Sequence, residues 1–246
     1  MGKRDRLTPP SRLLFVGRGD FRKTGEDLLR HFIDLAQLRP TDRVLDVGCG
    51  VGRMALPLAR YLGPKGSYEG FDVVDAGIDW CRKQITARYP RFRFQAADLH
   101  HDLYNPSGRF RASEYRFPYD DRSFDFVFAT SVATHLLAPD LENYLREISR
   151  VSRPGGRSLV TFFLLSDESR ELLRAGRSDI PFLCERGPCL IASEEEPGRA
   201  VAYDEAFIKS LYERCLLRID APVHFGSWPG RSEFLSYQDL VVATKL

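Results

Sequence analysis

The stretch that decides the fold reads Val44-Leu45-Asp46-Val47-Gly48-Cys49-Gly50-Val51-Gly52-Arg53. An apolar run that ends in an aspartate leads into three glycines spaced by two, and an apolar helical pattern follows to about Leu62. Glycines let the backbone turn sharply and let a ligand approach it without a Cβ in the way. The first turn of the following helix offers unpaired N–H groups and the positive end of the helix dipole. The stretch therefore predicts a buried strand, a ligand-binding turn and a helix.

The spacing of these glycines argues against a dinucleotide site. A Gly-x-Gly-x-x-Gly fingerprint that begins at Gly48 needs its third glycine at position 53, where this chain has Arg53, and the third glycine is Gly52 instead. Asp46 would be a poor neighbour for two phosphates, whereas it suits a ligand that carries an ammonium group. A nicotinamide oxidoreductase is for both reasons the least favoured interpretation.

Strand-like and helix-like patterns alternate on both sides of this stretch. Predicted strands cover residues 43–47, 67–73, 91–96, 124–129 and 157–164, with a turn at 154–156, and predicted helices cover residues 25–38, 77–89, 141–151 and 205–215. This alternation is typical of parallel βαβ units, so we expect an α/β sheet with helices on both faces. The β-like runs 217–225 and 237–244 are joined by too short a link for a crossover helix and should be antiparallel.

Two long segments fit no βαβ unit. Residues 100–119 and 166–203 each follow a predicted strand, and links of this length in compact domains are usually functional or disordered. We expect residues 1–40 to form an N-terminal cap segment and helix. Residues 41–246 should form the main domain, in which the insertion 166–203 covers the substrate pocket. The alternative is that both long segments are solvated insertions.

Two further aspartates follow strands of the predicted sheet. Asp72 ends the second strand, where folds of this kind accept ribose hydroxyls, and Asp98 ends the third, where a carboxylate accepts a hydrogen bond from an adenine amino group. Each aspartate alone is ordinary at the end of a strand. Together with Asp46 and the glycine turn, they predict a site for a nucleoside that carries a cationic group.

In these features the chain resembles the class I S-adenosylmethionine-dependent methyltransferases, over roughly residues 41–164. The stretch from Asp46 to Gly52 resembles the first motif of that family, Asp72 its ribose-binding acid and Asp98 its acid near the adenine. Residues 117–125 and 145–156 resemble the family's approach to the fourth strand and the helix and turn before the fifth.

The resemblance implies a Rossmann-like, doubly wound sheet of seven strands, mostly parallel with an antiparallel C-terminal strand. It implies S-adenosyl-L-methionine as cofactor and S-adenosyl-L-homocysteine as product, with Arg53 as a partner of the methionine carboxylate. The cofactor-binding residues that it implies are Asp46, Gly48, Cys49, Gly50, Gly52, Arg53, Asp72, Val73, Asp98, Leu99 and Thr130.

The resemblance gives the type of reaction and leaves the acceptor open. His135 lies just past the fourth predicted strand, and we interpret it as a general base for methylation of a hydroxyl on a small organic acceptor. The alternative for His135 is a structural histidine. Two further alternatives are N-methylation of a small molecule and a module that binds S-adenosylmethionine or a nucleoside without methyl transfer. An apolar wall of the pocket is expected from Phe15, Phe21, Phe182, Leu183 and Trp228.

Composition and charge argue against several other classes of protein. The 246 residues carry a net charge of +2, which argues mildly against a nucleic-acid substrate, and no apolar run is long enough for a membrane span. The five scattered cysteines do not suggest a disulfide framework, so we expect a reducing cytoplasm. Cys184 and Cys189 lack a second pair with zinc-ligand spacing, so no metal is expected. A homo-oligomer remains open.

Overall fold

The structure is a computed structural model that describes residues 7–14, 19–101 and 104–246. Two compact units make up the chain. The first comprises residues 1–110 with 124–128, and the second comprises residues 111–123 with 129–246. Phe15 of the predicted apolar wall and part of the predicted N-terminal cap lie outside the described residues.

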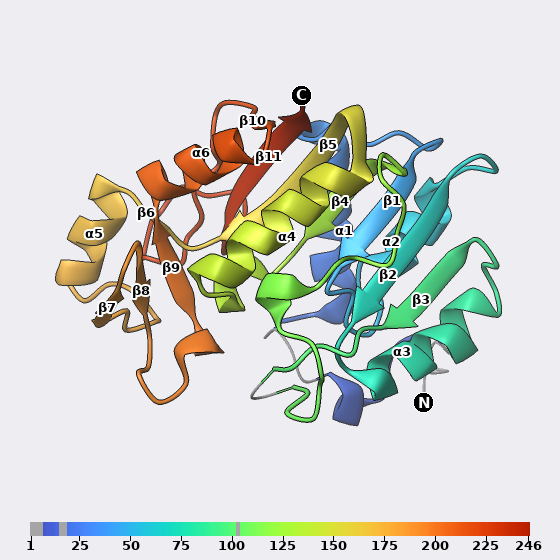
Figure 1. Ribbon diagram of the computed structural model, residues 1–246, viewed down its shortest axis with the longest axis horizontal. Coiled ribbons are helices and arrows are strands. Elements are labelled where there is room, and N and C mark those ends of the chain that lie inside the picture. The colour runs from blue at the N-terminus through green and yellow to red at the C-terminus, as the bar shows by residue number, and fades with distance from the viewer. Residues whose placement is uncertain (1–6, 15–18, 102–103) are drawn as a thin grey trace. The chain divides into compact units, whose positions relative to one another are not determined.

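Seven strands form one sheet in the order β10-β11-β5-β4-β1-β2-β3 (Figure 1). They are β1 (Arg43–Val47), β2 (Ser67–Asp72), β3 (Phe92–Ala96), β4 (Phe124–Ala129), β5 (Ser152–Phe162), β10 (Leu217–Ile219) and β11 (Asp239–Lys245). β1 runs parallel to β2 and β4, β2 runs parallel to β3, and β11 is antiparallel to both β5 and β10. The predicted sheet with one antiparallel C-terminal strand is confirmed.

In the first unit, helix α1 (Phe21–Asp34) begins four residues before the predicted start. The carboxylate of Asp20 accepts a hydrogen bond from the N–H of Lys23 at 2.7 Å and caps the helix there. The helix also ends earlier than predicted, because Gln37 takes a left-handed φ of 53°. Its Phe32 is fully buried against the rings of Phe126 and Phe128 in β4, at 5.2 and 4.5 Å between centroids.

The glycine turn leads into α2 (Ala55–Tyr61), and β2 leads into α3 (Asp75–Cys81). α3 continues as a wider π-type turn (Arg82–Thr86), so the single helix predicted over 77–89 is two pieces. The guanidinium of Arg82 donates to the carbonyl oxygen of Phe94 at 2.9 Å, which ties this turn to β3.

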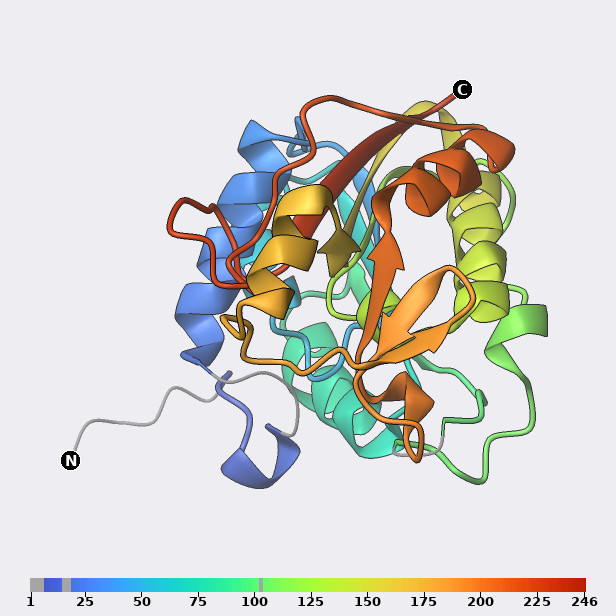
Figure 2. The same cartoon turned by 90° about the vertical axis from the view of Figure 1, so that its left-hand side faces the viewer.

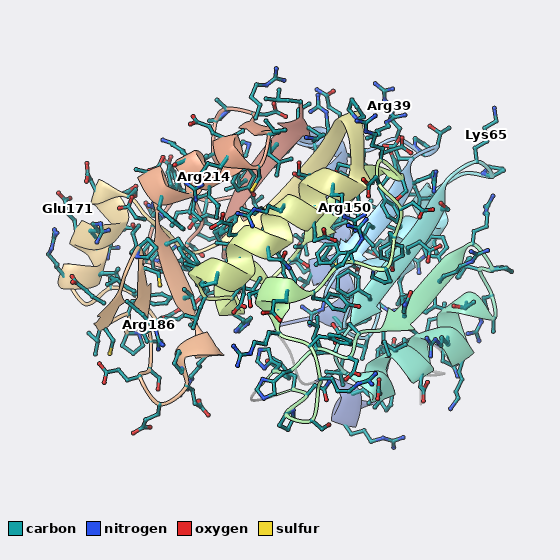
Figure 3. The ribbon with its side chains drawn as sticks, in the orientation of Figure 1. Arg39, Lys65, Arg150, Glu171, Arg186 and Arg214 are labelled. Atoms are coloured by element: carbon teal, nitrogen blue, oxygen red, sulfur yellow. The ribbon has the colours of Figure 1, made fainter. Side chains whose placement is uncertain are left out.

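In the second unit, α4 (Ala138–Val151) buries an apolar face, as its periodicity predicts, and α6 (Glu205–Arg214) precedes β10. β5 begins earlier than predicted and includes residues 154–156, which the sequence indicated as a turn. Three short 3-10 turns are described in this unit, η3 (Ala112–Glu114), η4 (Ala133–His135) and η5 (Pro197–Arg199), and one in the first unit, η1 (Ser11–Leu13). Figure 3 shows Arg150 on α4 and Arg214 on α6.

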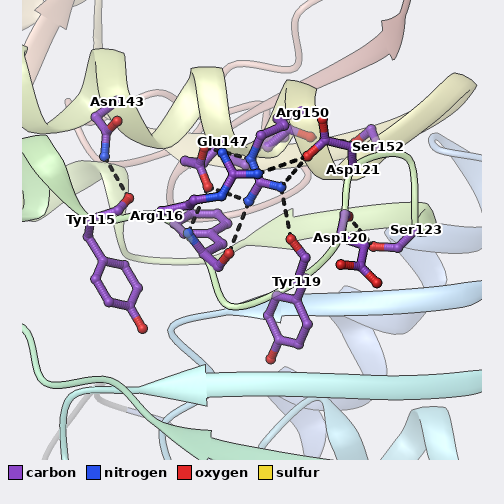
Figure 4. A network of polar contacts seen from close by, with 12 residues as sticks. Tyr115, Arg116, Tyr119, Asp120, Asp121, Ser123, Asn143, Glu147, Arg150 and Ser152 are labelled. Carbon is purple, nitrogen blue, oxygen red and sulfur yellow. Dashed lines mark hydrogen bonds and ion pairs between the residues drawn. The ribbon is translucent and has the colours of Figure 1, made fainter.

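Arg150 fixes the segment before β4 onto α4 (Figure 4). Its guanidinium donates to the carbonyl oxygens of Phe117 and Tyr119 and to the carboxylates of Asp121 and Glu147, at 2.6 to 3.0 Å. Glu147 in turn accepts the N–H of Phe117 at 2.7 Å. Since all five guanidinium N–H groups have acceptors, the long segment predicted as a loop is held to α4 by a saturated polar network.

The insertion 166–203 has a secondary structure that the sequence did not predict. A second sheet has the order β6-β9-β8-β7, and α5 (Asp167–Arg174) lies within the insertion (Figures 1 and 2). Its strands are β6 (Leu164–Leu165), β7 (Cys184–Arg186), β8 (Cys189–Ile191) and β9 (Val201–Asp204). These strands have two to four residues, too few for a period-2 pattern to be recognised.

The predicted apolar wall does not form as expected. Phe182 and Trp228 are buried and pack edge to face at 5.4 Å between ring centroids, with Phe163 against both. They form the core between the insertion and the segment before β11. Leu183 is 80% exposed instead. Phe182 therefore points into the core, whereas its neighbour Leu183 points to solvent.

Candidate functional site

The glycine turn after β1 is left-handed at each glycine. Gly48, Gly50 and Gly52 have φ angles of 78°, 53° and 74°, which side chains disfavour. The N–H groups of Gly48 and Cys49 both donate to the carbonyl oxygen of Phe71 at 3.0 Å, which ties the turn to β2.

Gly50 and Gly52 serve different purposes. A Cβ on Gly52 would lie 2.5 Å from Cδ1 of Ile85, so this glycine allows close packing. A Cβ on Gly50 would meet nothing within 4 Å. The backbone at Gly50 is therefore bare toward open space, as a surface that receives a ligand must be.

Asp72, at the end of β2, holds this turn from the side. Its Oδ2 accepts the N–H of Gly50 at 2.8 Å, and its Oδ1 accepts the N–H of Val74 at 2.9 Å, across Val73. Burial raises the pKa of Asp72, and the backbone N–H groups oppose this shift. The structure thus brings together Asp72, Val73 and the glycine turn, as predicted.

Asp46 is fully buried beneath the same turn. The hydroxyl of Tyr68 donates to its Oδ2 at 2.6 Å, whereas Oδ1 has no hydrogen-bond partner in the part of the chain that the structure describes. Burial raises the pKa of Asp46 to about 8, against the opposing effect of the Tyr68 hydrogen bond. A buried carboxylate oxygen without a donor is costly, which is why burial favours the protonated form of Asp46 in the ligand-free chain. A ligand ammonium group beside Oδ1 would supply the missing donor and favour the carboxylate.

Asp98 lies in a different environment from the other two acids. Its Oδ1 accepts the backbone N–H of Arg109 at 3.0 Å, and its Oδ2 is paired with the Arg109 guanidinium. These hydrogen bonds with Arg109 lower the pKa of Asp98, which is half-buried. Leu99, next in sequence, is buried. The sequence did not indicate Arg109 as a partner.

Cys49 and Arg53 complete the predicted set in the first unit. Cys49 is buried, and burial raises the pKa of its thiol well above the usual value, so it stays protonated. The Arg53 guanidinium lies 5.5 Å from the ring centroid of Phe21 in α1, and burial lowers its pKa. The cation–π contact orients this side chain beside the start of α2.

His135 belongs to the second unit and ends the 3-10 turn η4. Its Nδ1 lies 2.9 Å from the carbonyl oxygen of Gly198 in η5. Since a carbonyl only accepts, the proton is on Nδ1 and the lone pair is on Nε2. Burial lowers the pKa of His135, so the ring is neutral near pH 7. Thr130, the remaining predicted residue, follows β4 in this unit.

Two features of the second unit were missed by sequence reasoning. Ser131 has a left-handed φ of 57° directly after Thr130. A cavity of about 530 Å³ is lined by Glu168, Val223, His224, Phe225, Arg231, Ser232, Glu233, Phe234 and Leu235. The mixture of aromatic and charged residues over 223–235 is the signal in the sequence that could have indicated it.

Among the described residues there is no group of three or more His, Cys, Asp or Glu side chains placed to hold a metal ion. The five cysteines are free thiols. In the described ranges, no helix combines the length and the apolar character that crossing a membrane requires.

Residues 44–156 match the family model of a methyltransferase domain. Among curated proteins, the methyltransferase GfsG of Streptomyces halstedii is 31% identical over 137 residues, which are 55% of this chain and 42% of that protein. The 27-O-demethylrifamycin SV methyltransferase of Amycolatopsis mediterranei is 34% identical over 129 residues, 52% of this chain and 41% of that protein. The chain thus aligns with about two fifths of the length of these relatives.

Solved structures show the same fold at low sequence identity. The PH0226 protein of Pyrococcus horikoshii superposes with a TM-score of 0.66 at 17% identity, covering 96% of both chains. The magnesium protoporphyrin IX methyltransferase of Synechocystis, solved with bound S-adenosylhomocysteine, has a TM-score of 0.58 at 14% identity, covering 96% of this chain and 92% of that one.

The environment of Asp46 predicts a pH-dependent stability. Because its pKa is raised to about 8, the folded state holds a proton that the unfolded state has lost between about pH 4 and pH 8. Stability contributed by the protonated group is therefore lost as the pH rises through this window. We expect Asp46→Asn to flatten the slope of unfolding free energy against pH by up to about 1.4 kcal/mol per unit.

Urea unfolding at pH 5, 7 and 9 measures this slope. Asp79→Asn, in an exposed position of α3, is the matched control and should keep the wild-type slope. Parallel slopes for the wild type and Asp46→Asn would show that Asp46 is ionised in the folded protein at all three pH values.

Proposed function

We propose that this chain, whose residues 44–156 match the family model of a methyltransferase domain, is a class I methyltransferase that transfers a methyl group from S-adenosyl-L-methionine to a hydroxyl of a small organic acceptor. The observation that carries the proposal is the pairing of a bare left-handed Gly50 with a buried Asp46 oxygen that lacks a donor. Both features are what a cofactor with an ammonium group requires from its site.

The residues of the first unit fit the parts of this cofactor. Asp46 Oδ1 is an acceptor for an ammonium group, and the Asp72 carboxylate has further lone pairs for ribose hydroxyls beyond the backbone N–H groups that it accepts. We assign the Arg53 guanidinium as the ion-pair partner of the methionine carboxylate. We assign the adenine to Asp98 and Leu99. Gly48, Cys49, Gly50 and Gly52 contribute backbone.

When bound, the cofactor supplies a methyl group on a positively charged sulfur, which is already activated for transfer. The protein's contribution is then alignment of donor and acceptor, which lowers the barrier substantially without further chemistry. The hydrogen bonds from the N–H groups of Gly50 and Val74 to Asp72 support this role, because they hold the turn in place before the ligand arrives.

We assign proton removal to His135. Its Nδ1 proton is engaged by the Gly198 carbonyl, so Nε2 is the atom that accepts the proton of the acceptor hydroxyl. The lowered pKa supports this role, because a general base must be unprotonated at the working pH.

A small acceptor is supported by two observations. The cavity of about 530 Å³ over residues 223–235 lies in the size range of small-molecule sites, and its lining includes Glu168 of the insertion but not His135. The relative from Amycolatopsis is named for an O-methylation of a rifamycin. We propose that the insertion 166–203 covers the acceptor. Its η5 turn contacts His135 through the Gly198 carbonyl and so links the insertion to the base. Identification of the methylated product separates this proposal from its two alternatives. A methylated nitrogen would indicate N-methylation, and no methylated product would indicate cofactor binding without transfer.

Gly50→Val tests the cofactor site. The new side chain extends into the open space beside the turn, and we expect binding of S-adenosylhomocysteine to fall below detection by calorimetry while the thermal unfolding transition remains cooperative. Gly155→Val is the matched control, since Gly155 also has a left-handed φ, 74°, and open space at its Cβ. Wild-type affinity in Gly50→Val would remove this turn from the site.

His135→Ala tests the base. For a hydroxyl acceptor, kcat should fall by about 10²–10⁴-fold while affinity for S-adenosylmethionine is kept. The wild-type rate should decline as the pH falls through the His135 pKa, which lies below its usual 6.5, and the variant should lose this limb. His31→Ala, on α1, is the control. A variant with wild-type kcat from pH 6 to 9 would show that alignment alone suffices.

A further inference from the structure

Ser131 has a backbone conformation that serine disfavours. Its φ of 57° lies in the left-handed region, and it is one of four non-glycine residues with positive φ in the described chain. Such conformations persist only where the surroundings enforce them, and they concentrate at functional sites. Ser131 lies between Thr130 and η4, the turn that ends with His135.

We propose that Ser131, Thr161 and Gln238 form a positioning network that holds the turn after β4 so that His135 Nε2 meets the acceptor hydroxyl. This inference rests on the proposed function. It adds three residues that neither the sequence motifs nor the family match identifies as part of the site.

Three hydrogen bonds close this network. The N–H of Ser131 donates to Thr161 Oγ1 at 2.8 Å, and the Thr161 hydroxyl donates to Gln238 Oε1 at 2.5 Å. The Ser131 hydroxyl donates to the same Gln238 oxygen at 3.1 Å. Since Thr161 Oγ1 accepts one proton and gives another, removing its hydroxyl breaks two of the three links at once. Thr161 is buried in β5.

The far end of the network is itself fixed. Gln238 immediately precedes Asp239, a fully buried carboxylate. Asp239 accepts the N–H groups of Leu164 and Gly226 at 2.6 Å and the indole N–H of Trp228 at 2.8 Å. The side chain of Gln238 therefore extends from a backbone position that cannot shift, and Ser131 is held against a rigid support.

The near end of the network leads directly to the base. His135 N–H donates to the carbonyl oxygen of Val132 at 2.9 Å, so the turn that begins after Ser131 is tight. His135 also contacts Gly198 through Nδ1. If the φ of Ser131 relaxes to an ordinary value, the chain after it changes direction and His135 loses the Gly198 carbonyl.

Thr161→Val tests the network, because valine keeps the shape of threonine and lacks the hydroxyl. We expect kcat to fall roughly 10- to 100-fold, the size of effect that small misplacements of a reacting group produce. KM for S-adenosylmethionine should not change, since Thr161 lies outside the cofactor residues. Thr161→Ser restores the hydroxyl and should recover most of the wild-type kcat.

Ser158→Ala is the matched control on the same strand. Ser158 is equally buried, and its hydroxyl has no hydrogen-bond partner among the described residues, so its removal should leave kcat unchanged. Ser131→Gly adopts the left-handed φ without strain but lacks the hydroxyl. It should unfold at the same or a higher temperature than the wild type and still show a lower kcat.

A readout that needs no turnover separates this inference from the proposed function. Nitrogen NMR of the His135 ring should show the proton on Nδ1 in the wild type and in Thr161→Ser, and exchange between both tautomers in Thr161→Val. If the wild type transfers no methyl group, the proposed function fails, and the ring tautomer still tests the network. An unchanged ring signal and unchanged kcat in Thr161→Val would overturn the inference, as would a loss that serine does not recover.

Discussion

The hydrogen bonds from Gly50 and Val74 to the carboxylate of Asp72 are the constraint on which the candidate cofactor site depends. They join the turn after β1 to the end of β2 and hold the three left-handed glycines at positions 48, 50 and 52 in one arrangement. With that turn fixed, the backbone of Gly50 is presented bare, and Asp46 is sealed beneath it with one oxygen left without a donor. A turn free to relax would lose both features.

The three strand-end aspartates show how one residue type serves different roles through its surroundings. Burial raises the pKa of Asp46 to about 8, whereas pairing with Arg109 lowers the pKa of the half-buried Asp98. Asp72 lies between these cases, because backbone N–H groups stabilise its charge against burial. The sequence places all three at strand ends and does not distinguish their environments, which depend on Tyr68 and Arg109.

Much of the fold follows from local pattern. The limits of β1 and β4 agree with the prediction exactly, because buried apolar runs bounded by turn residues define short parallel strands well. Helix ends agree less well, since α1 begins at an Asp20 cap that the apolar periodicity does not include. The second sheet could not be predicted, because its strands are stabilised by contacts with Phe163 and Trp228, distant in sequence. The positive φ of Ser131 could not be predicted, because its hydrogen-bond partners Thr161 and Gln238 are distant in sequence.

The central claim is that the turn from Gly48 to Gly52, with Asp46 and Asp72, receives the cofactor. An amide NMR titration of the wild-type chain with S-adenosylhomocysteine tests it most directly, because it requires neither a variant nor knowledge of the acceptor. We expect the largest and saturable shifts to fall on the N–H groups of Gly50 and Val74 and their neighbours in the turn. Saturable binding that leaves these amides unmoved and shifts others would contradict it, as would the absence of any binding.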